Sequence, residues 1–283
     1  AGIKSQTIAI DESRFDALGM TVEEWVLPAL NSEAIEVYEQ RYIHFFGADA
    51  LAGISLGLYE HSTVGRESMF RVFSALGASV TKLGFSETFI PVDTEAIRPQ
   101  DVALAKEWAA TGNYDALVSA DGDCDRPLLS TEKGEWFRGD VLGVLCAEYL
   151  GADAIATPVS CNTLVEKTEL FKSIVRTRIG SPYVIEGMEQ LDSQFQAVVG
   201  YEANGGFLTQ SVLSHNGAQL SPLPTRDAFL PIIAVLLLSK ERKSTLSALA
   251  VNYPKRFTAS DRVKEFPTDK SQKILSQFNT GSE

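Results

Sequence analysis

The sequence is poor in cysteine, histidine and positive charge, and it has no long hydrophobic run. Three cysteines and three histidines are present, with no CxxC pair and no histidine at ligand spacing. This excludes a disulfide framework and a cysteine–histidine zinc site, and it predicts a reducing, cytoplasmic location. The longest apolar run, residues 228–239, is too short to span a bilayer. The N-terminal segment does not have the pattern of a secretory signal.

The balance of charge excludes a second group of partners. Asp and Glu number 37 against 25 Lys and Arg, which gives a formal net charge of -12 and an isoelectric point near 4.8. Nucleic acids and anionic membrane surfaces are bound through basic faces. We therefore expect no nucleic acid and no membrane as a partner, and an anionic substrate would need a local cluster of cations.

The length and the order of residue types predict the architecture. A chain of 283 residues with 45% hydrophobic residues is long enough for two packed domains. From residue 54, short β-branched runs alternate with helical patterns, and the alternation starts again after Gly151. This predicts an α/β fold of two consecutive three-layer α/β/α domains with mixed sheets. The pattern predicts a domain with an acidic loop over residues 35–150 and a second domain over residues 151–248, with shorter segments before and after them.

Individual elements are predicted from the same pattern. Helices are expected over residues 67–76, 101–110, 141–150, 162–171, 183–191 and 225–240. Strands are expected over residues 54–59, 79–85, 114–120, 154–160, 173–177 and 195–201, with one more strand-like run at 255–263.

Three aspartates follow a predicted strand in the segment LVSADGDCDRPL, residues 117–128. Carboxylates this close repel one another unless a positive charge lies among them. Asp121, Asp123 and Asp125 alternate along the loop, so they can converge on one centre, and their oxygens are ligands that Mg²⁺ prefers. Arg126 adds a cation that could hold these carboxylates or an incoming phosphate. The loop therefore predicts a magnesium site.

Three other interpretations of this loop stay open. The aspartates could form a solvated acidic turn. They also fit positions 1, 3 and 5 of an EF-hand with Glu132 at position 12, although Arg126 stands where that loop needs glycine. Finally, Asp121 could be the nucleophile of a phosphatase of the haloacid-dehalogenase type.

Two further segments are candidate substrate contacts. LFKSIVRTRIGSPYVI, residues 170–185, carries Lys172, Arg176 and Arg178 without any acidic residue, which favours a phosphate contact or a basic edge strand protected against aggregation. GYEANGGFL, residues 200–208, places Glu202 and Asn204 in a glycine-rich turn. Such groups suit hydrogen bonding to sugar hydroxyls, though the segment could also be a simple turn.

Together these motifs resemble the α-D-phosphohexomutase family. ADGDCDRPLLS resembles the metal loop of that family and GYEANGGFL resembles its sugar-recognition loop. Other segments are similar to the bacterial phosphomannomutase branch, namely YEHSTVGRESM, SETFIPVDTEA, FRGDVLG, TPVSCNT, RTRIGSPYVIEGM and LPTRDA. The resemblance is colinear over about residues 35 to 265, and it implies that the chain contains the second and third domains of such an enzyme. It also implies that residues 1–34 are an N-terminal remnant or linker and that residues 249–283 are the start of a truncated fourth domain.

The resemblance also implies the reaction and its participants. Phosphate would pass from a phosphoserine to a hexose 1- or 6-phosphate and return from the bisphosphate, so that C1 and C6 exchange phosphate, with a hexose 1,6-bisphosphate as activator. Mg²⁺ and Arg126 would offset charge during transfer. The implied Mg²⁺ ligands are Asp121, Asp123 and Asp125. The implied substrate contacts are Glu202 and Asn204 toward the sugar hydroxyls, with Arg176, Arg178, Gly180 and Ser181 from the RTRIGSP turn.

The sequence departs from the family pattern in several places. The phosphoserine motif and the C-terminal phosphate clamp are not found in these residues, and LSHNGAQL, residues 213–220, follows the sugar loop, so Ser214 is interpreted as unrelated to the phosphoserine. Asn204 and Ser181 replace the usual Ser and His. The chain alone is expected to bind Mg²⁺ without turnover, the alternative is a non-catalytic binding module, and mannose and glucose phosphates are not distinguished.

Overall fold

The computed structural model describes residues 12–23, 26, 28–29, 31–260, 263 and 265–278. The chain divides into two compact units, residues 1–36 and 37–283. In the first unit, the short 3-10 helix η2 (Glu12–Arg14) ends at an arginine that forms an exposed ion pair with Glu23 at 3.3 Å. Within the described residues, no helix has the length and hydropathy that a membrane crossing requires.

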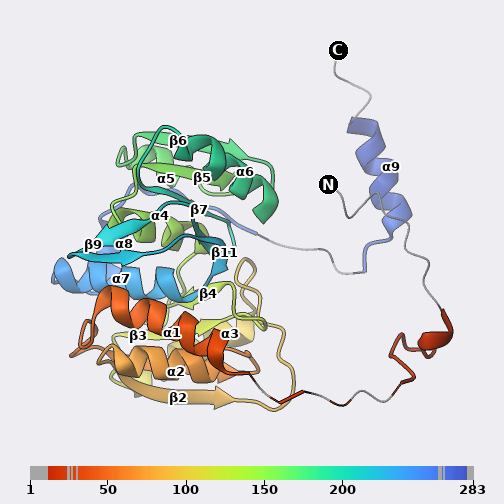
Figure 1. Cartoon of the computed structure of the whole chain (residues 1–283), viewed down its shortest axis with the longest axis horizontal. Helices are drawn as coiled ribbons and strands as arrows, with labels where there is room; N and C mark the ends of the chain where they lie inside the picture. The colour runs from red at the N-terminus through yellow and green to blue at the C-terminus, as the bar shows by residue number, and fades with distance from the viewer. Residues whose placement is uncertain are drawn as a thin grey trace. The chain divides into compact units, whose positions relative to one another are not determined.

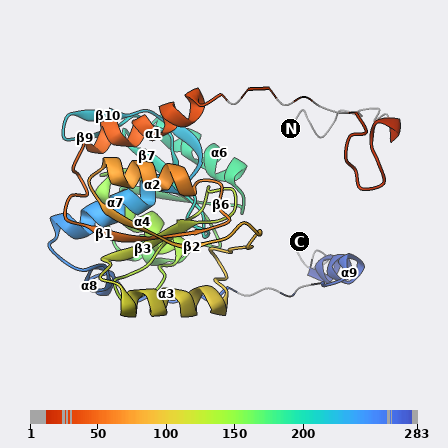
Figure 2. The same ribbon diagram turned by 90° about the horizontal axis from the view of Figure 1, so that it is seen from below.

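A four-stranded mixed sheet forms the first layered region of the second unit (Figure 1). Its strands lie in the order β2-β1-β3-β4, with β4 antiparallel to β3 and the other pairs parallel. Helices α2 (Arg66–Ala75) and α3 (Pro99–Thr111) cover opposite faces (Figure 2). The burial of β1 along almost its whole length is typical of a central parallel strand. The strand bounds are β1 (Ser55–His61), β2 (Ser79–Phe85), β3 (Ala116–Ala120) and β4 (Pro127–Leu129).

A five-stranded sheet forms the second layered region, in the order β11-β8-β7-β5-β6. Strands β6, β5 and β7 are parallel, and β8 runs antiparallel both to β7 and to β11. Helix α6 (Ser181–Asp192) packs on β5, β6 and β7, while the short α5 (Leu164–Lys167) contacts α4. The strand bounds are β5 (Ala154–Pro158), β6 (Ser173–Thr177), β7 (Val198–Tyr201), β8 (Phe207–Thr209) and β11 (Leu223–Asp227).

Helices α4 (Gly139–Tyr149) and α7 (Phe229–Glu241) join the two sheets (Figure 1). They pack on each other, and α7 contacts β4 while α4 contacts β7. Almost every residue of α7 is buried, as expected for a helix that is apolar on all faces. One core cluster therefore runs from Leu58 on β1 to Val199 on β7.

A buried carboxylate fixes α1 (Glu33–Phe46) beside this core. Asp227, at the end of β11, accepts hydrogen bonds from the hydroxyls of Tyr38 at 2.7 Å and Tyr42 at 2.5 Å. It also accepts the backbone N–H of Phe229 at 2.9 Å. The same side chain thus anchors α1 and caps the start of α7.

The other described elements are a small sheet and two helices. A small sheet pairs β9 (Leu213–His215) with β10 (Ala218–Leu220), and Ser214 lies in it opposite Gln219. Helix α8 (Leu246–Val251) follows α7, and α9 (Thr268–Phe278) has no buried residue.

The predicted α/β fold with mixed sheets is confirmed, and most elements lie where the sequence placed them. The helix expected over 225–240 is wrong at its start, because residues 223–227 pair with β8 and Asp227 caps a helix that begins at Phe229. Helix α5 is shorter than expected since Glu169 adopts a φ of 55°. Residues 255–260 form no strand, and 261–262 lie outside the described residues. The domain boundaries near residues 34, 150 and 248 stay predictions.

Candidate functional site

Two loops occupy matching positions in the two sheets. The acidic loop, residues 121–126, connects β3 to the antiparallel β4, and the glycine loop, residues 202–206, connects β7 to the antiparallel β8. In each loop the first N–H donates to the last carbonyl at 3.1 Å, from Asp121 to Arg126 and from Glu202 to Gly206. Both loops are therefore closed by backbone bonds at their base.

The three aspartates of the acidic loop converge as predicted. One carboxylate oxygen from each of Asp121, Asp123 and Asp125 lies within 4.8 Å of the others. Asp121 is buried, and its Oδ1 accepts the backbone N–H groups of Asp125 at 3.2 Å and Arg126 at 3.1 Å. Burial, together with the nearby charges of Asp123 and Asp125, raises the pKa of Asp121 to about 6.

Neighbouring cations neutralise the three carboxylates of the cluster only in part. The Nε of Arg126 lies 3.5 Å from both Asp121 Oδ2 and Asp125 Oδ1, too far for a good hydrogen bond. Asp125 Oδ1 is buried and accepts no hydrogen bond among the described residues. Burial raises the pKa of Asp125 although Arg226 opposes this shift. Three convergent carboxylates with one buried, unbonded oxygen fit a divalent cation with oxygen ligands.

Two of the alternative interpretations of this loop do not fit. The EF-hand interpretation is wrong because strands, not helices, flank the loop, and Glu132 accepts the N–H of Ser247 at 3.0 Å instead of facing the cluster. A solvated acidic turn does not agree with Asp121, of which only 6% is exposed.

A buried histidine supports the end of the strand that leads into the acidic loop. His61, the last residue of β1, lies with its Nε2 2.8 Å from the carbonyl oxygen of Ala120, the last residue of β3. A carbonyl only accepts, so Nε2 is assigned as the donor. Burial lowers the pKa of His61, which agrees with a neutral ring. The exit of β3 is thus fixed by a side chain as well as by the sheet.

The glycine loop holds two buried polar side chains, and both were predicted. Glu202 accepts the hydroxyl of Ser181, the first residue of α6, at 3.1 Å through Oε2. Asn204 accepts the N–H of Gly206 at 2.9 Å through Oδ1, and its carbonyl accepts the Thr94 hydroxyl at 2.8 Å. Ser181, Glu202 and Asn204 are therefore brought together at one turn.

The glycine loop packs against the residue that follows the acidic loop. Gly205 adopts a φ of 90°, and a Cβ there would lie 2.9 Å from Pro127 Cγ and 3.0 Å from Gly139 Cα. Pro127 directly follows the acidic loop, and Gly139 begins α4. Only a glycine permits both this backbone conformation and this approach.

Arg226 on β11 links the loops electrostatically, and the sequence analysis did not single it out. Its Nη2 lies 2.6 Å from Asp125 Oδ2, and its Nη1 lies 3.7 Å from Glu202 Oε2. Its aliphatic part lies over Gly206, where a Cβ would come within 2.7 Å of it. The motif LPTRDA was noted only as a family likeness, because Arg226 is a hundred residues from the acidic loop along the chain.

The structure does not bring all the predicted residues of the RTRIGSP turn to one place. Arg178 is exposed and lies over the ring of Tyr183, 5.7 Å from its centroid, beside a cavity of about 390 Å³. Gly180 adopts a φ of 124° and precedes the first residue of α6. Arg176 instead bonds Glu166 at 2.8 Å and the carbonyls of residues 158, 161 and 162. Its geometry favours a structural role, and its substrate contact stays a prediction.

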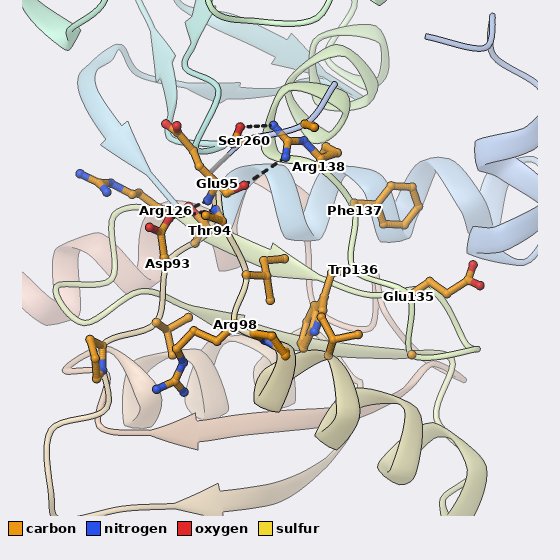
Figure 3. Close-up of a pocket in the computed structure, with 18 of the residues that line it drawn as sticks. Asp93, Thr94, Glu95, Arg98, Arg126, Glu135, Trp136, Phe137, Arg138 and Ser260 are labelled. Atoms are coloured by element: carbon orange, nitrogen blue, oxygen red, sulfur yellow. Dashed lines mark hydrogen bonds between the residues drawn. The ribbon is translucent and has the colours of Figure 1, made fainter. Parts of the chain in front are cut away.

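A large cavity adjoins the acidic loop (Figure 3). Its volume is about 970 Å³, and Arg126 lines it together with the segment 91–99 and residues 136–138. Arg138 crosses its edge, donating to the carbonyl of Glu95 at 3.0 Å and to the hydroxyl of Ser260 at 2.9 Å (Figure 3). Thr94, in its wall, is the residue that bonds the glycine loop. The cavity is thus bounded by groups connected to both loops.

Comparisons with known proteins agree with this geometry. Residues 138–257 match the family model "Phosphoglucomutase/phosphomannomutase, alpha/beta/alpha domain III". A phosphomannomutase of Salmonella muenchen is 41% identical over 254 residues, which are 90% of this chain and 53% of that protein. A phosphomannomutase of Sinorhizobium fredii is 43% identical over 246 residues, which are 87% of this chain and 52% of that protein.

A solved structure shows the same fold. The phosphoglucomutase/phosphomannomutase family protein of Burkholderia thailandensis superposes with a TM-score of 0.62 at 18% identity, over 78% of this chain and 47% of that one. The chain spans about half the length of the curated relatives it matches.

Proposed function

Since this chain belongs to the α-D-phosphohexomutase family, we propose that it forms the metal-binding and sugar-binding part of a Mg²⁺-dependent, cytoplasmic phosphohexomutase. The enzyme would exchange phosphate between C1 and C6 of a hexose phosphate, by way of a phosphoserine and a hexose 1,6-bisphosphate. The observation that supports this most is the joining of the two loops. The acidic cluster and the carboxylate of Glu202 are connected through one arginine, Arg226.

In this proposal the acidic loop serves the transferring phosphate. Asp121, Asp123 and Asp125 would hold Mg²⁺, whose charge would stabilise the phosphoryl group during transfer. Arg126 would take the catalytic role, because its guanidinium borders both the cluster and the large cavity. It would donate hydrogen bonds to the phosphate oxygens with its Nη atoms.

The glycine loop would orient the sugar ring. Glu202 would accept hydrogen bonds from the 3- and 4-hydroxyls of the sugar, and Ser181, bonded to the same carboxylate, would keep it in place. The Oδ1 and carbonyl oxygens of Asn204 are already used, which leaves its amide nitrogen to donate to a hydroxyl.

The distal phosphate would lie at the start of α6. This helix of 12 residues begins at Ser181 after Gly180, and the positive end of its dipole favours an anion although Pro182 has no N–H. Arg178 is exposed beside it and would add a positive charge, whereas Arg176 is held by Glu166.

A coupled mutase assay and a Mg²⁺ titration test this proposal. The assay would use mannose 1-phosphate and glucose 1-phosphate with Mg²⁺ and a hexose 1,6-bisphosphate. We expect this chain to bind Mg²⁺ and sugar phosphate, and Asp123→Asn to abolish Mg²⁺ binding while the fold is kept. Unchanged Mg²⁺ affinity in that variant would contradict the proposal. Turnover by this chain alone would mean that a serine among these 283 residues carries the phosphate.

Two alternative functions give different results in the same experiments. A non-catalytic module would bind both ligands, yet the full-length protein would show no mutase activity. A phosphatase with Asp121 as nucleophile would release inorganic phosphate from a phosphomonoester, and Asp121→Asn would stop the release. The contacts of Asp121 disfavour this second alternative, because backbone N–H groups occupy Oδ1 and Arg126 faces Oδ2.

A further inference from the structure

The guanidinium of Arg226 is shared by two carboxylates that have different proposed partners. It is close to Asp125, at 2.6 Å, and more distant from Glu202, at 3.7 Å. Its side chain is 25% exposed, and its stem is held against Gly206. The charged end therefore needs only a short movement to change from one carboxylate to the other.

A cation at the acidic loop would compete with Arg226 for Asp125. Of the two oxygens of this carboxylate, Oδ2 faces Arg226 and Oδ1 accepts no hydrogen bond from the described residues. Once a divalent cation neutralises Asp125, the attraction between Asp125 and Arg226 weakens. The guanidinium has five N–H donors, so it can then turn to Glu202 and to an anion bound beside it.

We propose that Arg226 couples the two loops, so that a divalent cation at the acidic loop releases its guanidinium for a sugar phosphate bound at the glycine loop. This inference rests on the proposed function. By thermodynamic linkage the effect is mutual: the cation strengthens the binding of sugar phosphate, and sugar phosphate strengthens the binding of the cation by the same factor. Coupled sites ordinarily show factors of about 5 to 150.

A purely structural role for Arg226 predicts something else. If the residue only held β11 and the loops in place, its replacement would weaken both ligands and leave their coupling factor unchanged. If it competes with the cation, its replacement leaves cation affinity in the absence of sugar phosphate equal to or higher than that of the wild type. Coupling is lost only in the second case.

Isothermal titration calorimetry of this chain distinguishes the two. Mg²⁺ would be titrated without and with saturating mannose 1-phosphate, and mannose 1-phosphate without and with saturating Mg²⁺. In the wild type we expect each ligand to lower the Kd of the other by about fivefold or more. In Arg226→Gln the ratio of the two Mg²⁺ dissociation constants should be close to one, without loss of Mg²⁺ affinity in the absence of sugar phosphate.

Two further variants make the result independent of folding and of total charge. Arg71→Gln removes the same charge from an ion pair with Glu39 between α2 and α1, and it should keep the wild-type coupling. Arg226→Lys keeps the charge without the forked geometry, so it should fold and show reduced coupling. Independent binding by the wild type, or a wild-type factor in Arg226→Gln, would overturn the inference alone. A wild type that binds neither ligand would overturn the proposed function as well.

Discussion

The acidic loop and the glycine loop have the same backbone arrangement but carry different polar and charged side chains. Each leaves a buried strand, closes with a 3.1 Å bond between its first N–H and its last carbonyl, and returns as an antiparallel strand. The acidic loop carries three carboxylates and an arginine, whereas the glycine loop carries one carboxylate, an amide and two glycines. The backbone therefore provides the position, and the side chains decide between a cation and a neutral, hydroxylated ligand.

The largest effect on stability is expected where the glycine loop packs beside the acidic loop, at Gly205. Gly205→Ala should lower the free energy of unfolding by about 2 to 4 kcal/mol, because a left-handed backbone and a close approach to Pro127 and Gly139 are both disturbed. Gly217→Ala is the matched control. Gly217 also has a positive φ, of 82°, but nothing lies near its Cβ position, so the cost should be about 1 to 2 kcal/mol. Equal losses in urea denaturation would mean that the loops do not constrain each other.

Removing one negative charge from the acidic loop should weaken the binding of the cation, whereas the binding of sugar phosphate measured without the cation should be kept. Asp123→Asn should weaken Mg²⁺ binding by about a hundredfold or more, since even outer partners of a metal site contribute about 10- to 100-fold. Mannose 1-phosphate should still bind in the absence of Mg²⁺. Glu107→Gln, at an exposed acid on α3, removes the same charge and should leave the Mg²⁺ affinity unchanged. A comparable loss in this control would point to net charge in place of ligation.

The corresponding change in the glycine loop should weaken the binding of sugar phosphate, whereas the binding of the cation measured without sugar phosphate should be kept. Glu202→Gln should reduce the affinity for mannose 1-phosphate in the absence of Mg²⁺ by about tenfold, the effect of one charge-assisted hydrogen bond. Mg²⁺ affinity measured in the absence of sugar phosphate should stay within about twofold of the wild type. Calorimetric titration of both ligands checks this, and a large loss of Mg²⁺ affinity would mean that the loops do not divide the two tasks.

The smallest expected effect is a dependence of stability on pH that arises in the acidic loop. The pKa of Asp121 is raised from 3.8 to about 6, so the folded state holds its proton more tightly than the unfolded state. Its contribution is fully present below about pH 3.8 and is lost as the pH rises through about 6. Without Mg²⁺, the free energy of unfolding should therefore decrease across this range.

Denaturation with urea at about pH 4.5 and about pH 6.5 measures this decrease. Asp121→Asn should flatten the profile, and saturating Mg²⁺ should offset the loss at the higher pH because it binds ionised carboxylates. If Asp121→Asn shows the same slope as the wild type, another group controls the dependence.

Local patterns in the sequence were sufficient for much of the fold and for parts of the site. The alternation of β-branched runs and helical patterns predicted most strands, and the spacing of Asp121, Asp123 and Asp125 predicted a cluster that the fold brings together. Arg226 was missed because its partners come from other segments, and only the pairing of β11 with β8 places it between the loops. The expected freedom of Arg176 likewise ignored Glu166, which lies on a different element.

The last two residues of β11 point to opposite faces of the sheet. This restricts the insertions and deletions that the chain can accept near this strand. Arg226 contacts the loops, while Asp227 lies in the core with the two tyrosines of α1. An insertion or deletion of a single residue that shifted β11 by one position would place either the guanidinium of Arg226 in the core or the carboxylate of Asp227 against Asp125, depending on its direction. Natural length variants are therefore expected at the turn of residues 216–217, between β9 and β10, where the phase of β11 is unaffected.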